Sequence, residues 1–459
     1  MGQNTELQPA PVERLSVELV RMILSDLPDV SSLQAAALSC PLFYKAFSGA
    51  ENTITTQVLL RNIDKSLLPE VLLAFKSSGL HWRRMRDNRR QAVADFITQN
   101  LHQRTVLPPS WPLRKAIHFE RLNFCVKELT EMFIQATLTR NPINQSKAAA
   151  TCQETHRIQR AFYRFEIYRN LFSERPKPYY DTPGEESPLF FASFSPWENE
   201  QLGCVHDFLV QAVSPAFNDV AEHDVAWGAF NVNYGDLIDS PYIQHVLSLG
   251  LEELHRITLA STYEERYRLL NTPSGPPATN GFLQDALETA NNANEDLFLD
   301  RLTPEQEALH IKKPFFADPD SGPRDVWLWA HKVESWANWV YQENRRQLRQ
   351  WGYVMWDKSR LETAGVLQEP WYDPTGTPEW LLQEEEAVRQ RGYMQNSWEK
   401  RERIRMKGGS GWWSWGDESK VKWPKNIFFP GQGRSVPGNI KPASLREARE
   451  LLSMMKLPK

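Results

Sequence analysis

Residues 11–47 read PVERLSVELVRMILSDLPDVSSLQAAALSCPLFYKAF, and this stretch carries explicit signals for short helices. Ser16 is placed to cap the first helix, and Glu18 puts a negative charge in its first turn, where the helix dipole favours it. Pro28 ends that helix, because the proline ring removes a hydrogen-bond donor and restricts the residue before it. The stretch therefore predicts a first short helix between Ser16 and Pro28.

Two further helices are expected within the same stretch. Ser31 and Gln34 have the spacing of a capping box, which predicts a second helix. Pro41 suits the first position of a third helix, and Gly49 suits its end. Because so small a segment cannot enclose all its apolar side chains, we expect some of them to be available to a partner.

The first helix carries a broad apolar stripe at helical spacing. Its members are Leu19, Val20, Ile23, Leu24 and Leu27. Such a stripe is typical of a helix that packs on other helices, and it also suits a surface that docks on a separate protein.

Residues 11–50 resemble the F-box. The matching positions are Leu15, Glu18 and Leu19 in the opening, then Ile23, Leu24, Ser25 and Leu27, then Leu33, Leu38, Cys40 and Phe43. Two positions depart from the family pattern: Ser16 stands where the family usually has proline, and Phe43 where it usually has tryptophan. The whole layout also resembles F-box-like proteins of filamentous fungi, in which a long, tryptophan-rich helical body follows the motif.

The resemblance implies an adaptor rather than an enzyme. The segment would dock on the Skp-family adaptor protein of a cullin–RING ubiquitin ligase, and the rest of the chain would hold a protein target of unknown identity. The residues implied in docking are Leu15, Glu18, Leu19, Ile23, Leu24, Leu27, Leu38 and Phe43. Three alternatives stay open: an F-box-like interaction or structural protein that works without the ligase, a helical enzyme, and an ordinary helical hairpin that belongs to a larger core.

Composition narrows the classes of partner. Charged residues make up 24% of the 459 residues and the formal net charge is −4, which argues against nucleic acid as the main partner. A basic run at 81–90 is either an import or anion-binding patch or, as such runs more often are, a solvated helix face. No segment has the length and apolarity of a membrane span or a signal peptide, so we expect a protein of the cytoplasm or nucleus.

The 4 cysteines, Cys40, Cys125, Cys152 and Cys204, are widely spaced. They predict buried thiols in a reducing compartment rather than a disulfide framework.

Helical stripes are common along the chain and strand patterns are scarce, so the sequence predicts an all-α protein. We expect an F-box-like motif at 11–50, a helical body at 51–320 and a tryptophan-rich region at 321–459. The aromatic segment 156–172 should be a central helix packed on two sides. Its three arginines, Arg157, Arg160 and Arg164, are expected to pair with Glu154 or Glu166, or else to bind an acidic ligand.

The tryptophan-rich region contains 13 of the 17 tryptophans. Most of these should be core, and Trp412, Trp413 and Trp415 are the ones we expect to be exposed. Trp329, Val333, Trp336 and Val340 are expected on one helical face, and a last helix is expected at 443–456. Residues 407–442 should be irregular and wrapped over a surface.

One cluster could in principle bind a metal ion or act in acid–base catalysis. It consists of His206, Asp207, Asp219, Glu222, His223 and Asp224, with the two histidines expected on separate helices. The spacing matches no known ligand pattern, so we predict structural histidines and no metal or cofactor. Phosphate-binding and nucleophile-elbow motifs are also missing from the sequence.

Overall fold

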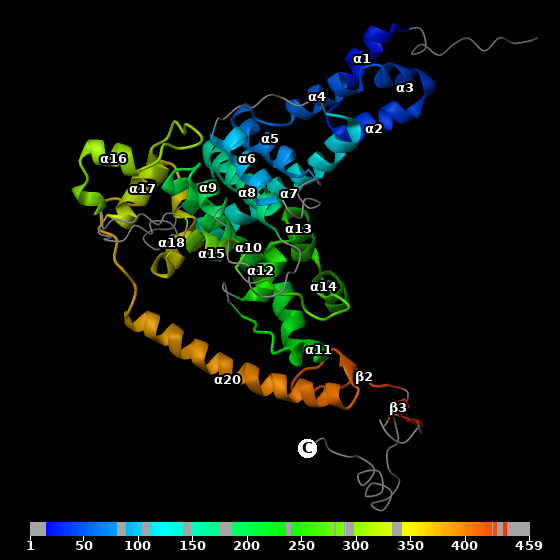
Figure 1. The fold of residues 1–459 in the computed structure, drawn as a ribbon, viewed down its shortest axis with the longest axis vertical. Coiled ribbons are helices and arrows are strands. Elements are labelled where there is room, and N and C mark those ends of the chain that lie inside the picture. Colours follow the sequence, from blue (N-terminus) through cyan, green and yellow to red (C-terminus); the bar gives the residue numbers. More distant parts are fainter. Residues whose placement is uncertain are drawn as a thin grey trace, which may run out of the picture. The chain divides into compact units, whose positions relative to one another are not determined.

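A computed structural model describes residues 15–79, 89–102, 111–140, 148–173, 186–235, 240–279, 281–288, 290, 298–332, 342–424, 426–428 and 435–437. The described part is all-α, as the sequence predicts, with twenty α-helices and four very short strands (Figure 1). Several expectations fall outside the described residues: the start of the 11–50 segment, residues 81–88 of the basic run, Val333, Trp336, Val340, and the last helix at 443–456.

The helices follow one another along the chain. Their bounds are α1 Val17–Ser25, α2 Val30–Ser39, α3 Pro41–Ser48, α4 Glu51–Arg61, α5 Leu68–Ser77, α6 Arg89–Phe96, α7 Leu113–Thr137, α8 Cys152–Phe172, α9 Glu186–Phe191, α10 Pro196–His223, α11 Val225–Gly228, α12 Pro241–Leu247, α13 Leu251–Leu259, α14 Tyr263–Leu270, α15 Leu283–Glu288, α16 Pro304–His310, α17 Gly322–His331, α18 Arg346–Trp351, α19 Lys358–Thr363 and α20 Pro378–Met406. Short helical turns, such as η2 at Lys65–Leu67 and η7 at Tyr353–Met355, connect some of them. The strands form two antiparallel pairs, β1 Ser410–Gly411 with β2 Val421–Lys422 and β3 Asn426–Phe428 with β4 Ser435–Pro437.

The chain divides into two compact units that do not follow sequence order. Unit 1 comprises residues 1–210, 244–256 and 279–373, and unit 2 comprises 211–243, 257–278 and 374–459. This division differs from the linear one expected at residues 320 and 321, because segments far apart in the sequence share one core. Residues 321–373 belong to unit 1, where α17 packs against η7 and η7 packs against α8.

Helix α8 is the centre of unit 1, as its aromatic sequence predicts. Thr151 and Glu154 form a capping box at its start, and nearly every residue from Glu154 to Leu171 is buried. It packs on α5, α7 and η7. A helix enclosed on all sides must also bury its polar side chains, and these then require partners from other elements.

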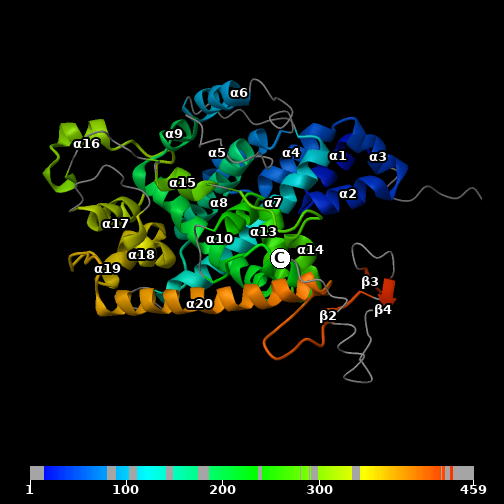
Figure 2. The ribbon, with the colours of Figure 1, turned by 60° about the horizontal axis from the view of Figure 1, so that its bottom comes forward.

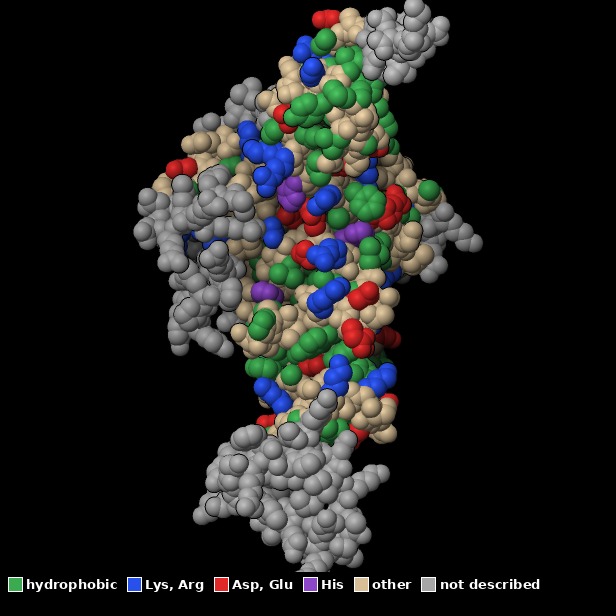
Figure 3. All heavy atoms as spheres, turned by 90° about the vertical axis from the view of Figure 1, so that its right-hand side faces the viewer, with side chains coloured by type: hydrophobic (Ala, Val, Ile, Leu, Met, Phe, Trp, Pro, Cys, Tyr) green, Lys and Arg blue, Asp and Glu red, His purple; other side chains and the backbone are tan. Residues whose placement is uncertain are grey.

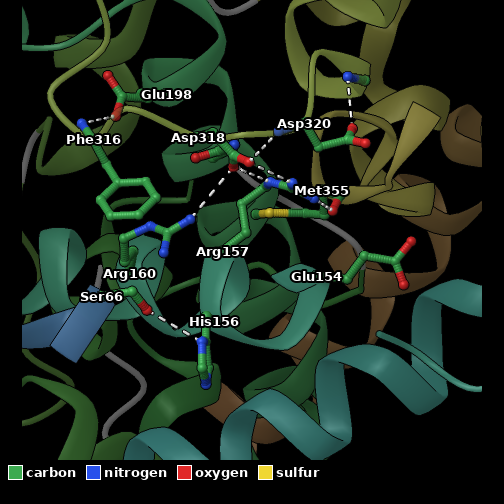
Figure 4. Close-up of polar contacts among 12 residues, drawn as sticks. Ser66, Glu154, His156, Arg157, Arg160, Glu198, Phe316, Asp318, Asp320 and Met355 are labelled. Carbon is green, nitrogen blue, oxygen red and sulfur yellow. Dashed lines mark hydrogen bonds and ion pairs between the residues drawn. The ribbon is translucent and has the colours of Figure 1, made fainter. Parts of the chain in front are cut away.

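The arginines of α8 find those partners far away in sequence (Figure 4). Arg157 donates to Asp318 and Asp357 at 2.8 and 3.1 Å, and it is only 1% exposed. Arg160 lies over the ring of Phe316, with 3.7 Å from its guanidinium carbon to the ring centre, and its Nη2 is 3.4 Å from Asp318.

Arg164, the third of these arginines, also pairs with residues of other segments. It donates to Glu70 at 3.0 Å and to Glu198 at 2.8 Å. The expected partners Glu154 and Glu166 were therefore wrong: Glu154 pairs with Arg360, and Glu166 accepts from the backbone of Leu251. Pairs between neighbouring turns of one helix form on solvated faces, whereas these arginines point into a core built from other segments.

Helix α10 corrects a second expectation. The sequence predicted that His206 and His223 lie on separate helices, but one helix continues from Pro196 to His223 with Pro215 inside it. His206 and His223 therefore lie on the same helix.

The core of unit 2 includes Val225, Ile404, Trp413 and Val421. Trp413 is thus buried, contrary to expectation, and its backbone N–H donates to the carbonyl of His223 at 2.8 Å. Trp415 is exposed as expected. Arg401 is fully buried and donates to the carbonyls of Ala221 and Asp224 at the end of α10.

Candidate docking surface

Helix α1 has one buried face and one exposed apolar face. The Ser16 hydroxyl caps it by accepting from the backbone of Leu19 at 3.4 Å, as the sequence predicts. Val20 and Leu24 point inward and are fully buried. The exposed apolar side chains of α1 are Val17, Leu19, Met22 and Ile23.

Helix α2 starts earlier than its expected capping box. Asp29 caps it by accepting from the backbone of Ser32 at 2.6 Å, and Ser31 lies inside the helix. The Ser31 hydroxyl and the Val30 N–H both donate to the carboxylate of Glu120 on α7, at 3.0 and 2.7 Å. Asp29 rather than Ser31 caps α2, because its carboxylate accepts from an N–H group at the start of the helix, two residues before the position expected from Ser31.

Helix α3 begins at Pro41, and Gly49 is the cap that follows its last residue, as the sequence predicts. It buries Ala46 and Phe47 and leaves Tyr44 exposed. Leu38, near the end of α2, is 68% exposed.

The three helices are held firmly against the rest of unit 1 (Figure 2). Helix α1 packs on α3 and α4, and α2 packs on α4 and α7. Arg21 donates to the carbonyl of Ala46 at 3.1 Å, and Arg61 of α4 pairs with Asp26 at 2.7 Å. The buried side of helices α1–α3 is therefore part of the core of unit 1. The packing of this side fixes the position of the exposed side.

We define the α1–α3 surface as the exposed apolar side chains Val17, Leu19, Met22, Ile23, Leu38 and Tyr44. Figure 3 shows hydrophobic side chains gathered at the top of its view, over these helices. Single exposed apolar residues are common on proteins, but a group of six on adjacent helices is typical of an interaction site.

The eight residues implied in docking divide into three groups. Glu18, Leu19, Ile23 and Leu38 are exposed, and Leu15, Leu27 and Phe43 are partly exposed. Leu24 lies on the inner side of α1 and is fully buried. It packs beneath the exposed face, and a partner could not contact it. Sequence reasoning missed Val17, Met22 and Tyr44, although Val17 and Met22 lie on the same helix as the predicted residues.

The two histidines of α10 have structural partners. His206 is fully buried between Asp207, at 3.1 Å, and Gln244, at 2.9 Å, and Asp207 in turn pairs with Arg349. In unit 2, the Nδ1 of His223 lies 2.9 Å from the carbonyl of Trp413. Within the described ranges no group of three or more His, Cys, Asp or Glu side chains could hold a metal ion.

A cleft of about 960 Å³ lies beside the segment, lined among others by Asp29, Phe124, Cys125 and His255. The Cys125 thiol is 3.7 Å from His255. Burial raises the pKa of Cys125 to about 11 and lowers that of His255, so both groups are neutral near pH 7. This pair therefore lacks the thiolate that nucleophilic catalysis needs.

Among the helices that the structure describes, none has both the length and the apolar character to cross a bilayer. Comparisons with models of protein families, with curated proteins and with solved structures found no match to this chain.

Proposed function

We propose that this chain is an F-box-type adaptor of a Skp–cullin–RING ubiquitin ligase. Its α1–α3 surface docks on the Skp-family adaptor protein, and the remainder of the chain holds a protein target. The chain performs no chemistry of its own; it promotes ubiquitin transfer by holding the target close to the ligase.

The observation that carries this proposal is the exposed apolar face of α1. Leu19 and Ile23 are one turn apart, and both are more than two-fifths exposed. The backing residues Val20 and Leu24 are fully buried, so the face is displayed on a packed support. Pre-organised apolar side chains of this kind are the usual anchors of a helical interface.

The experiment is a pulldown of the full chain with a purified Skp-family adaptor. The double variant Leu19→Asp/Ile23→Asp should lose binding, because unpaired charges in an apolar interface cost several kcal/mol, against about 8 kcal/mol for a micromolar complex. Its thermal melt should stay close to that of the wild type, since both side chains already face solvent.

Leu309→Asp is the matched control, since Leu309 of α16 is 77% exposed and lies outside the α1–α3 surface. That variant should bind as the wild type does. If the wild-type chain captures no adaptor, the ubiquitin-ligase function fails and the F-box-like interaction protein becomes the better proposal. If the double variant unfolds at a much lower temperature than the wild type, helices α1–α3 are part of the folded core, as in the helical-hairpin alternative.

A further inference from the structure

The start of α8 brings together a thiol, an imidazole and a carboxylate. The Sγ of Cys152 lies 3.6 Å from Nε2 of His156 and 4.0 Å from its Nδ1. On its other side, Nδ1 of His156 lies 3.2 Å from the Ser66 hydroxyl and 3.8 Å from the carboxylate of Asp64 (Figure 4 shows the Ser66 contact). These residues come from α8 and from η2, so two separate elements build the cluster.

The geometry favours one tautomer of His156. The negative charge of Asp64, 3.8 Å from Nδ1, favours a proton on that nitrogen and leaves the lone pair on Nε2, the nitrogen nearer to Cys152. Hydrogen bonds from the side chain and backbone of Ser66 lower the pKa of Asp64, so this carboxylate is ionised near pH 7. It therefore lies where it can orient the imidazole for transfer of the thiol proton.

Two other features make Cys152 a candidate nucleophile. Cys152 is the first residue of a 21-residue helix, whose dipole is positive at this end. Its side chain is exposed, so a reagent in solution can reach it, contrary to the buried thiols that the sequence predicts.

The other cysteines lack this combination. Cys204 is fully buried, and burial raises its pKa well above the usual value. Cys125 is buried and neutral, as described above. Cys40, at the junction of α2 and α3, is partly exposed and has no His contact among the described residues.

We propose that Cys152 is a modification site for thiol–disulfide exchange, with His156 as the base and Asp64 as the group that orients it. His156 accepts the thiol proton, and the Cys152 thiolate attacks one sulfur of a small disulfide such as glutathione disulfide. The bond between Cys152 and that sulfur forms as the disulfide bond breaks. The second thiolate leaves and takes up the proton, so one mixed disulfide and one free thiol result. This inference does not depend on the proposed adaptor function.

The test uses the full chain with glutathione disulfide and, separately, with iodoacetamide. Peptide mass spectrometry follows the modification of each cysteine over time. At pH 7, Cys152 should react roughly tenfold or more faster than Cys40 with both reagents. His156→Gln should remove most of this advantage at pH 7. At pH 9.5, above the ~8.5 of an ordinary thiol, a base is no longer needed and the variant should approach the wild type.

His118→Gln is the matched control, because His118 is an exposed histidine that lies 3.6 Å from a carboxylate, that of Glu252. It should leave the Cys152 rate unchanged. If His156→Gln lowers the melting temperature, Asp64→Asn takes its place as the test variant. It should slow the modification of Cys152 at pH 7 by a smaller factor, and its rate should also approach that of the wild type at pH 9.5. Equal rates for Cys152 and Cys40 at pH 7 would overturn the proposal. Fast alkylation without a mixed disulfide would overturn the assignment to thiol–disulfide exchange.

Discussion

Helices α1 and α8 depart from the usual division between apolar interior and polar surface, and they do so in opposite directions. Helix α1 exposes four large apolar side chains, whereas α8 buries three arginines. Exposed apolar groups gain stability only when a partner covers them, while buried charges require partners within the same chain. The arginines of α8 find their partners within this chain. The exposed face of α1 is the one that we propose a second protein covers.

The largest effect is expected from Arg157→Ala. This change leaves the buried Asp357 without its guanidinium partner and leaves the partly buried Asp318 with only its longer contact to Arg160, which should lower the free energy of unfolding by about 3–5 kcal/mol. Chemical denaturation of the full chain measures it. Arg256→Ala is the control, because the pair of Arg256 with Glu253 lies on the surface and should contribute less than about 1 kcal/mol. If the two variants lose a similar free energy of unfolding, the buried ion pairs of Arg157 do not stabilise the protein more than a surface pair does.

The second effect compares two neighbouring residues of α1. Leu24→Ala removes a fully buried side chain and should cost about 2–5 kcal/mol. Ile23→Ala removes a side chain that is 44% exposed, and it should change stability by less than about 1 kcal/mol. Thermal melts of both variants, side by side, provide the measurement. If Ile23→Ala is as costly as Leu24→Ala, the outer face of α1 is packed in solution and no docking surface exists there.

The third effect is a pH dependence of the α8 network. Burial alone would raise the pKa of Asp318, but the hydrogen bonds and charge of Arg157 outweigh it and hold that pKa below its usual value. The folded-state pKa is therefore lower than the unfolded-state value of about 3.9, so the unfolded chain takes up the proton first. Asp318 thus contributes stability above about pH 4, and this contribution is lost as the pH falls through the folded-state pKa.

Asp318→Asn isolates this contribution. The variant should be less stable than the wild type at pH 6. The difference in stability should be smaller at pH 3, which lies below the unfolded-state pKa of about 3.9, because the unfolded wild-type chain is then protonated. Urea midpoints at the two pH values measure the gap. A gap that stays constant, or widens at pH 3, would show that the pair with Arg157 does not depress the pKa of Asp318.

Local signals predicted several helix boundaries, although not the start of α2 or the length of α10. Ser16, Pro41 and Gly49 lie where the sequence places them, because caps and proline positions act through the nearest residues. The Thr151–Glu154 capping box, missed in the sequence, has the same kind of signal and could have been found.

Contacts between distant segments could not be predicted from the sequence. The partners of Arg157 lie 161 and 200 residues away, and no local rule connects them. Trp413 was expected to be exposed because the glycine-rich stretch 408–416 indicates a flexible context, yet the segment between β1 and β2 places it in the core of unit 2. The α1–α3 surface was only partly predicted for a similar reason, since the burial of Leu24 depends on how the helices pack together.

The central claim is that a separate protein covers the outer face of α1. Isothermal titration of a Skp-family adaptor into the wild-type chain and into Leu19→Asp/Ile23→Asp tests it most directly. We predict a dissociation constant in the micromolar range or tighter for the wild type, and no measurable heat of binding for a double variant that melts as the wild type does. Equal binding by both proteins, or no binding by the wild type, would contradict the claim.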